Sequence, residues 1–324
     1  MYNLCGFKEE KFTPITKAGA FCNASCEYFY HFLKEILFST FFFAKCRNFF
    51  MKKIMIIQIV FVGCILFFPE PGSSQVSKKL TPVIPSATVH LFNGKNLDGW
   101  YTYLQKNGRD NDPQKVFSVT HGMLRIGGEE WGCITTHKAF GNYRLLAQFK
   151  WGGKTFAPRV SNARDCGILL HSNGADGGSQ GIWMRSIECQ IIEGGTGDFI
   201  VVGDSSDAFQ LTTTVAKQKA DDSYVYLPAG DTMKFINDRV NWYARDAGWK
   251  DTIGFRGTYD IEKPVGEWNT MECIADGGEL TVILNGKIVN HAFNVQPVNG
   301  RIQIQAEGAE IYFRRVDLVP LETR

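Results

Sequence analysis

Apolar and polar residues alternate with a period of two along most of the chain from residue 87 onward. This period is the pattern of strands that bury one face. In the run Ser186 to Ile192, Ile187, Cys189 and Ile191 fall on one face, and Ser186, Glu188 and Gln190 fall on the other. The run Arg301 to Gly308 likewise separates apolar residues from Gln303, Gln305 and Glu307. The pattern predicts an all-β protein with two polar stripes on its sheets.

Glycine-rich turn signals divide this pattern into short strands. Asp276-Gly277-Gly278 and Asn285-Gly286 bracket the run Glu279 to Leu284, which predicts an antiparallel meander over 268–293. The Asn-Gly pair suits a type I′ turn, because both central residues take a positive φ there. Between Gly194 and Gly266 the alternation weakens, so we expect long loops over one end of a sandwich, with a helix conceivable only around Thr232 to Asn241.

The N-terminal part carries a targeting pattern. Basic Met51-Lys52-Lys53, the apolar run Ile54 to Phe68 and the small residues Gly72-Ser73-Ser74 have the layout of a secretory signal. We therefore expect residues 1–50 to precede the true start, 51–74 to form the signal peptide, 75–86 a linker and 87–324 one β-sandwich domain. The protein is then exported to the periplasm or cell surface of a bacterium, without a stable membrane span. A lipoprotein anchored through Cys64 is the less favoured alternative.

Charge and cysteine content restrict the partners. The 324 residues include 35 Lys and Arg against 33 Asp and Glu, and the part from residue 75 onward is close to neutral. This charge balance gives no electrostatic attraction for nucleic acid. Outside the N-terminal part the chain has four cysteines. An oxidising compartment would permit disulfide bonds among them, but buried free thiols fit their apolar surroundings at least as well. They are Cys133, Cys166, Cys189 and Cys273.

No cofactor motif is evident, and a divalent metal is left open. The acidic residues Asp204, Asp207, Asp221 and Asp222 could bind calcium, but their spacing matches no known ligand loop. Acidic loop residues of this kind are more often simply solvated.

The two polar stripes are the main candidates for chemistry. Sugar hydroxyls need donors and acceptors at fixed positions, which such a sheet face can supply, whereas an ordinary solvated sheet face is the simpler interpretation of either stripe alone. The strand 167–171 ends at His171, whose imidazole could lie near Glu188 if the two strands are neighbours. Arg159, Arg164 and Asp165 precede that strand and could reach the same place.

A glycosidase interpretation is also open. The segment Glu188 to Glu193 approximates the Glu-x-Asp-x-x-Glu pattern of sandwich-fold β-glucanases, with Gln190 in the position of the assisting Asp. Retaining hydrolysis needs two carboxyl groups about 5–5.5 Å apart. Glu188 and Glu193 have opposite parity along a strand, so they share a face only if a bulge intervenes.

Residues 87–322 resemble the 3-keto-disaccharide hydrolase family, also described as the 3-keto-glucoside 1,2-lyase and 3-keto-2-hydroxy-glucal hydratase domain. The segments that carry the resemblance, in order, are Leu91 to Trp100, Cys166 to Leu169, Glu188 to Ile191, Gly266 to Asn269, Leu284 to Lys287, Gly300 to Gln305 and Phe313-Arg314. His171 stands where the family often has Arg.

The resemblance implies a concanavalin A-like jelly roll that binds a small carbohydrate already oxidised at C3. It implies cleavage of 3-keto-glycosides by elimination and then hydration. On this hypothesis Glu188 is the base, His171 is the acid or the donor to the enolate, and Gln190 orients the substrate. Further substrate contacts are expected from Gln305, Glu307, Arg164, Trp242 and Trp249. The rival function is a non-catalytic carbohydrate-binding domain on the same fold, in which the two tryptophans hold glycan.

Overall fold

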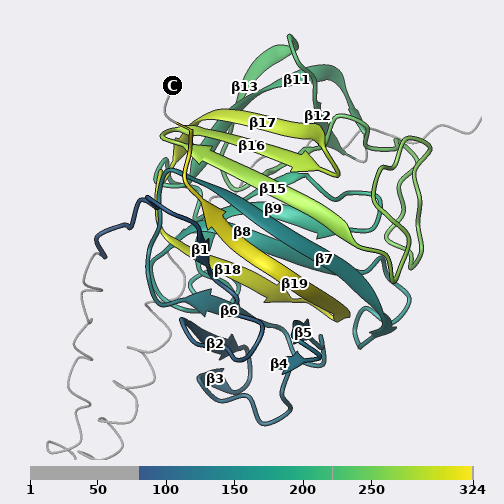
Figure 1. Cartoon of the computed structure of the whole chain (residues 1–324). Helices are drawn as coiled ribbons and strands as arrows, with labels where there is room; N and C mark the ends of the chain where they lie inside the picture. Colours follow the sequence, from purple (N-terminus) through teal and green to yellow (C-terminus); the bar gives the residue numbers. More distant parts are fainter. Residues whose placement is uncertain (1–79, 221, 323–324) are drawn as a thin grey trace, which may run out of the picture. The chain divides into compact units, whose positions relative to one another are not determined.

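Strand pairing organises the chain into two sheets. The computed structural model describes residues 80–220 and 222–322, and these contain strands but no helix. The described residues form one compact unit. The pairing falls into two sets, which we call the β7 sheet and the β8 sheet after their long central strands (Figure 1).

The β7 sheet has the order β4-β5-β19-β7-β15-β16-β17, with β1 beside β19. Its strands are β1 (Val89–His90), β4 (Phe117–Thr120), β5 (Met123–Ile126), β7 (Tyr143–Thr155), β15 (Asn269–Asp276), β16 (Glu279–Leu284), β17 (Lys287–Gln296) and β19 (Ala309–Val319).

The β8 sheet has the order β3-β2-β6-β18-β8-β9-β10-β14-β12-β11, and β11 also pairs with β13 and β17. Its strands are β2 (Trp100–Leu104), β3 (Gly108–Arg109), β6 (Gly132–Thr136), β8 (Asp165–Asn173), β9 (Arg185–Ile192), β10 (Phe199–Val202), β11 (Gln210–Ala220), β12 (Ser223–Tyr226), β13 (Asp231–Phe235), β14 (Arg239–Asn241) and β18 (Arg301–Ala306).

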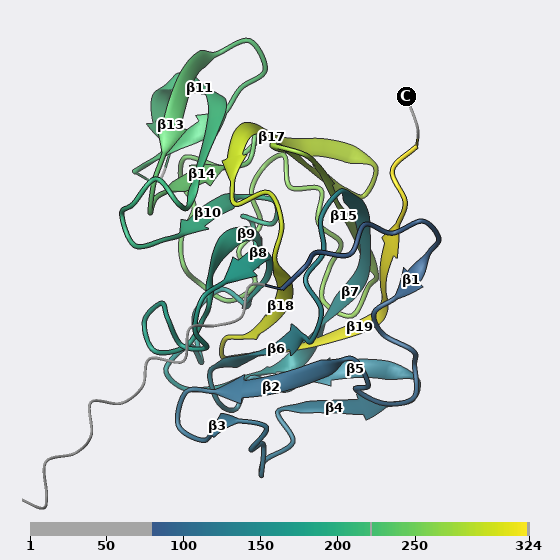
Figure 2. The same cartoon turned by 90° about the vertical axis from the view of Figure 1, so that its left-hand side faces the viewer.

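The chain crosses repeatedly from one sheet to the other. β5, β6, β7 and β8 alternate between the sheets, and so do β17, β18 and β19, so strands that are consecutive in sequence face each other across the core (Figure 2). This crossing is the connectivity of a jelly roll. The jelly-roll β-sandwich expected from the sequence is confirmed.

The core lies between the two sheets because each sheet turns its apolar face inward. Along β7 every second residue from Tyr143 to Trp151 is buried, and along β9 Ile187, Cys189 and Ile191 are fully buried in the same cluster. Burial of apolar surface stabilises the fold by roughly 25 cal/mol per Å². The polar residues of β9 consequently face away from this core.

The predicted meander is confirmed. β15, β16 and β17 pair in sequence with two-residue connections, and Asn285 and Gly286 have φ of 49° and 83°, as a type I′ turn requires. The prediction of loops over 194–266 is wrong for its first half, which contains β10 to β14. The possible helix around 232–241 is also wrong, since β13 and β14 occupy that segment.

The predicted targeting segments, 1–50 and 51–74, lie outside the described residues, as does most of the predicted linker. Within the part of the chain that the structure describes, no helix has the length and apolar character needed to cross a membrane.

Candidate active site

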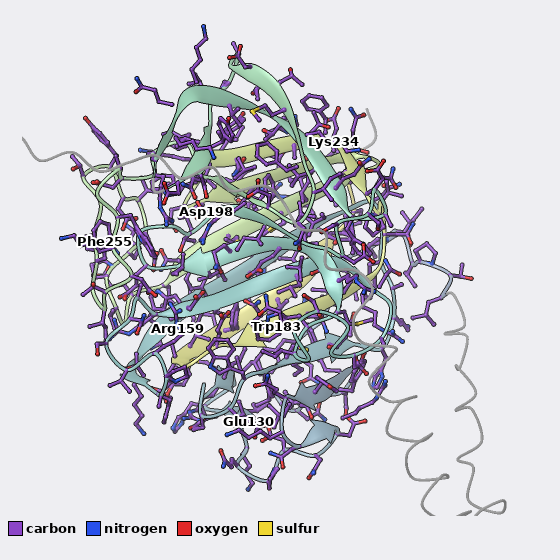
Figure 3. All side chains as sticks on the ribbon, turned by 180° about the vertical axis from the view of Figure 1, so that it is seen from behind. Glu130, Arg159, Trp183, Asp198, Lys234 and Phe255 are labelled. Carbon is purple, nitrogen blue, oxygen red and sulfur yellow. The ribbon has the colours of Figure 1, made fainter. Side chains whose placement is uncertain are left out.

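The two polar stripes meet on the outer face of the β8 sheet. β18, β8 and β9 are adjacent, with Gln303 opposite Leu169 and Leu169 opposite Glu188. Two residues along, Gly167 lies opposite Gln190. Figure 3 shows the molecule from the side opposite to that of Figure 1, with Arg159, Trp183 and Asp198 labelled. Register therefore brings stripes from distant parts of the sequence onto one surface.

This face is buried, unlike a solvated sheet face. Glu188 and Gln190 are each 4% exposed and Gln305 is 2% exposed. Burying an ionisable group is costly unless it is paired or performs chemistry. The burial therefore distinguishes this stripe from the surface alternation that the sequence alone left open.

Gly167 makes room for the central pair of side chains. A Cβ atom at this position would lie 2.1 Å from Glu188 Oε1 and 2.4 Å from Gln305 Oε1. The side chains of β9 and β18 therefore converge over the backbone of β8. Within the described residues, both of these oxygens are buried without a hydrogen-bond partner. An acceptor pair left unsatisfied in this way is suited to a ligand that donates hydrogen bonds.

Three carboxyl groups, which we call the acidic cluster, share this surface: Asp165, Glu188 and Glu307. Burial, reinforced by Asp165, raises the pKa of Glu188 to about 8. Burial also raises the pKa of Asp165 to about 7 and the pKa of Glu307 well above its ordinary value, where Asp165 and Glu188 add to the shift. Carboxyl groups that repel one another and titrate near neutrality are suited to acid-base chemistry.

Two arginines border the acidic cluster. Arg159 pairs with Asp165 at 3.1 Å and also with Asp251 at 3.0 Å. Arg239 shares the face of Glu188, because Ile200 lies opposite both of them, on β14 and β9. The charge of Arg239 opposes the upward shift in the pKa of Asp165, Glu188 and Glu307. Arg239 is itself paired with the buried Asp198 at 2.9 Å. The site thus combines proton-transfer groups with a cation that Asp198 holds in place.

A different environment surrounds Gln303, at the other end of the same stripe. Its amide donates to Thr135 Oγ1 at 2.9 Å, and its oxygen accepts from the backbone N–H of Met184 at 3.1 Å. An apolar cluster lies on the same face, made of Cys133, Leu169, Ile182, Trp183 and Val202. We call Gln303 together with this cluster the covered half of the face. The side-chain oxygen and nitrogen of Gln303 are both hydrogen-bonded within the protein, so Gln303 has a structural role.

The structure corrects the expected position of His171. Its strand does lie beside β9, but a register shift follows Leu170, and His171 has a φ of 54°. The imidazole Nδ1 lies 2.7 Å from the carbonyl oxygen of Pro297, and the ring packs edge-on against Tyr143 of the β7 sheet. Burial lowers the pKa of His171 to about 4. The contacts of this side chain are therefore in the interior, away from Glu188.

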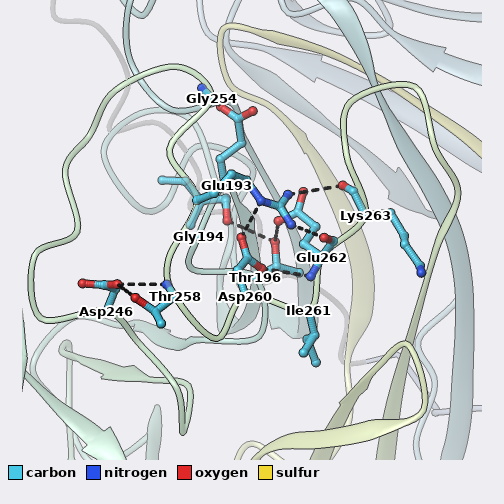
Figure 4. Close-up of polar contacts among 12 residues, drawn as sticks. Glu193, Gly194, Thr196, Asp246, Gly254, Thr258, Asp260, Ile261, Glu262 and Lys263 are labelled. Carbon is cyan, nitrogen blue, oxygen red and sulfur yellow. Dashed lines mark hydrogen bonds and ion pairs between the residues drawn. The ribbon is translucent and has the colours of Figure 1, made fainter.

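Arg164 and Glu193 pair with each other beyond the end of β9. Arg164 Nη1 lies 2.7 Å from Glu193 Oε1, and Glu193 Oε2 accepts from the backbone N–H groups of Arg164 and Gly254, each at 2.9 Å. Figure 4 shows Glu193 and Gly254 at this place. The substrate contact expected of Arg164 stays a prediction, since this pairing engages one of its terminal nitrogens, Nη1, with Glu193. The pairing also argues against the β-glucanase interpretation, because Glu193 is engaged in anchoring a loop and does not face Glu188.

The two candidate tryptophans hold the loop that follows β14. Trp242 is 2% exposed within the main core, and its indole N–H donates to Gly194 O at 3.2 Å, so the prediction that it binds substrate is wrong. Trp249 is half-buried, donates to Glu193 O at 2.9 Å and packs under Arg245 at 4.1 Å. Thr196 and Glu262 fasten the same loop at 2.7 Å (Figure 4).

Two of the acidic residues considered for calcium, Asp204 and Asp207, are paired with cations. Asp204 lies 3.2 Å from Arg185, and Asp207 lies 3.0 Å from Lys234. Asp221 is outside the described residues. Over the described ranges, 80–220 and 222–322, no group of three or more His, Cys, Asp and Glu side chains is arranged to hold a metal ion. Cys133, Cys166, Cys189 and Cys273 are all buried free thiols.

Sequence reasoning missed Arg239 entirely. A signal was present, because Val240 and Trp242 alternate with polar residues and are buried in the core, which sends Arg239 to the outer face. The loop prediction for 194–266 hid this alternation. Asp165 was named only as one of three residues that could reach the site.

The strands that build this site fall within a match to a known family. A family model described as "3-keto-alpha-glucoside-1,2-lyase-like domain" matches residues 87–319, which span β1 to β19. No curated protein matches the chain significantly.

Among solved structures, one similar chain is a protein from Parabacteroides distasonis with a provisional assignment as a glycosyl hydrolase. Its identity is 18% and its TM-score 0.44, covering 73% of this chain and 94% of that chain. The Bacillus licheniformis β-glucanase has 12% identity and a TM-score of 0.38, covering 72% and 99%. A carbohydrate-binding module of Bacillus subtilis has 11% identity and a TM-score of 0.36, covering 68% and 94%.

Proposed function

Since this chain belongs to the family of 3-keto-alpha-glucoside-1,2-lyase-like domains, we propose that it cleaves 3-keto-glycosides and that the acidic cluster carries the reaction. Family membership supports a carbohydrate-active enzyme. The observation that favours the specific reaction is the buried Glu188, whose pKa is raised to about 8 beside a second carboxyl group and a cation. A base with a pKa near the working pH transfers protons efficiently.

The reaction follows from the ketone. A carbonyl group at C3 acidifies the proton on C2, so a base can remove that proton and form an enolate. Collapse of the enolate forms the C1–C2 double bond and expels the glycosidic oxygen, which takes a proton from an acid. Water then adds across the double bond, with the hydroxyl group at C1 and the proton at C2. The net result is hydrolysis of the glycosidic bond without direct displacement at C1.

Residues of the acidic cluster can divide these roles. Glu188 is the proposed base, with its carboxyl group placed over Gly167 beside Gln305. Asp165 and Glu307 have raised pKa values, so either can hold a proton near neutrality and donate it to the leaving oxygen. Arg239 is placed to stabilise the enolate oxygen electrostatically. Gln190 and Gln305 remain proposed substrate contacts. His171 has no part in this scheme.

The proposal is tested by incubating the purified protein with a 3-keto-glucoside and with the matching unoxidised glucoside. Turnover of only the keto compound supports the elimination route. Turnover of the plain glucoside supports direct hydrolysis, and binding without turnover of either supports a carbohydrate-binding domain. We further propose export, which cell fractionation of the native host tests.

A further inference from the structure

A cavity beside the acidic cluster has the character of a second sugar site. It has a volume of about 270 Å³ and lies between Trp131, Ile182 and the Ala157–Pro158 turn, with Glu129 and Glu130 at its rim. Gln105 and Lys106 complete the lining. Drug-sized ligands occupy pockets of about 300–1,000 Å³, so this volume suits a single ring. Apolar walls with a polar rim are typical of pockets for small polar ligands.

The acidic edge of this cavity is held in place by the protein. Glu129 Oε1 pairs with Arg125 at 3.0 Å, so the carboxylate keeps its orientation.

Glu130 has a different role at the same rim. It is 5% exposed and accepts from the Lys106 backbone N–H at 2.7 Å and from Asn107 Nδ2 at 2.6 Å. These bonds fix the loop that forms one wall, so the wall is preformed.

Strand register places this cavity next to the acidic cluster. Ala306 of β18 lies opposite Gly132 of β6, so the next residues outward, Glu307 and Trp131, are neighbours on the same face. Adjacent strands are about 4.8 Å apart. The side chain of Trp131 packs with the apolar cluster on this face, which fixes its direction. Arg159, which follows the Ala157–Pro158 turn, pairs with Asp165 and so connects the cavity wall to the cluster.

From these observations we propose that the Trp131 cavity binds the departing sugar ring of a disaccharide substrate. The proposal rests on the function proposed above. The keto ring lies at Glu188, and the second ring lies against the side chain of Trp131, which lines the cavity. An indole ring suits this role because it offers a broad apolar face.

The test compares two substrates, a 3-keto-glucosyl disaccharide and methyl 3-keto-glucoside, which lacks the second ring. In Trp131→Ala we expect the ratio of the two KM values, disaccharide over methyl glycoside, to rise at least tenfold. Trp131→Phe keeps a smaller aromatic ring at this position, so its ratio should rise by a smaller factor. An unchanged ratio in both variants overturns the proposal.

Trp268→Ala is the matched control. Trp268 is also partly buried, but it lies against Lys150 and Arg314 of the β7 sheet, so its removal should leave the KM ratio unchanged. Thermal unfolding of each variant checks that the fold is retained, and Trp131→Phe decides the matter if the alanine variant is unstable.

A separate readout distinguishes failure of the subsite from failure of the proposed function. If the wild-type protein turns over neither keto compound, the proposed function fails. Binding of the unoxidised disaccharide is then measured by saturation-transfer NMR. The subsite predicts binding by the wild type that weakens at least tenfold in Trp131→Ala, while equal binding by the two proteins overturns it.

Discussion

The covered half and the acidic cluster lie on the same face of the same sheet, yet they differ in how their polar atoms are satisfied. Gln303 is fully buried and exchanges hydrogen bonds with Thr135 and the Met184 backbone. Glu188 is buried almost as deeply, but its Oε1 has no partner within the described residues. The two side chains are similarly buried, but only one has hydrogen-bond partners for its polar atoms. This difference distinguishes a structural polar group from a candidate reactive one.

A polar stripe therefore has two possible meanings, which burial and hydrogen bonding together distinguish. A satisfied buried amide specifies packing and has no titratable charge. A buried carboxyl group without hydrogen-bond partners has a raised pKa. The stability of the surrounding fold keeps the group away from water. The following predictions are designed to test whether this division of the face is correct.

The largest effect is expected from Glu188→Gln. Removing a general base costs about 10²–10⁴-fold in rate, so turnover of a 3-keto-glucoside should fall by that factor. The fold should persist, because a neutral amide replaces a carboxyl group that is desolvated in the native state. Steady-state kinetics and thermal unfolding measure the two effects. Full activity in this variant would remove Glu188 from the mechanism.

A smaller loss is expected from Gly167→Ala. The added Cβ would fall within 2.4 Å of oxygens of both Glu188 and Gln305, so both side chains must move. Misplacing a reacting group by about 1 Å can cost on the order of 10²-fold in rate. The loss should appear in kcat, as measured by kinetics on the keto substrate. Gly153→Ala is a suitable control, because a Cβ atom at that position would have no neighbour within 4 Å and activity should be unchanged.

Stability should depend on pH through the acidic cluster. The pKa of Glu188 is raised from 4.5 to about 8 in the folded state, so between these values the folded protein holds a proton that the unfolded chain releases. The stabilisation is complete below about pH 4.5 and is lost as pH rises towards 8. At about 1.4 kcal/mol per pKa unit, the wild type should lose a few kcal/mol relative to Glu188→Gln.

This dependence is measured by urea unfolding of both proteins at intervals from about pH 5 to about pH 8. A constant stability difference across that range contradicts the assigned shift. The rate constant kcat/KM of the wild type should rise over the same interval, because the base acts in its deprotonated form.

The smallest effect on turnover is expected in the covered half. Gln303→Ala leaves the Met184 N–H without its acceptor, which should destabilise the fold by about 1–3 kcal/mol. Turnover per folded molecule should stay within a few-fold of the wild type. Denaturant unfolding together with steady-state kinetics separates the two quantities. A loss of kcat comparable to that of Glu188→Gln would show that the two halves act as one site.

The assignment of residues to the faces of a strand followed from the amino-acid sequence alone. Alternation correctly divided Ile187, Cys189 and Ile191 from the polar residues of β9, and the Asn285-Gly286 pair correctly located a hairpin turn, because both depend on local backbone geometry. The stripes of β9 and β18 and the all-β class were therefore predictable from local pattern, whereas the jelly roll was implied by the family resemblance.

The identity of the neighbouring groups and the depth of their burial came from the tertiary structure. The approach of Arg239 and Asp165 to Glu188 depends on pairing among β14, β10, β9 and β8. Three further strands, β11 to β13, separate β14 from β10 in the sequence. A register shift after Leu170 turned His171 inward, and the loop after β9 engaged Arg164 with Glu193. Local alternation assigns a side chain to a face, whereas desolvation and its effect on pKa arise from everything packed around that side chain.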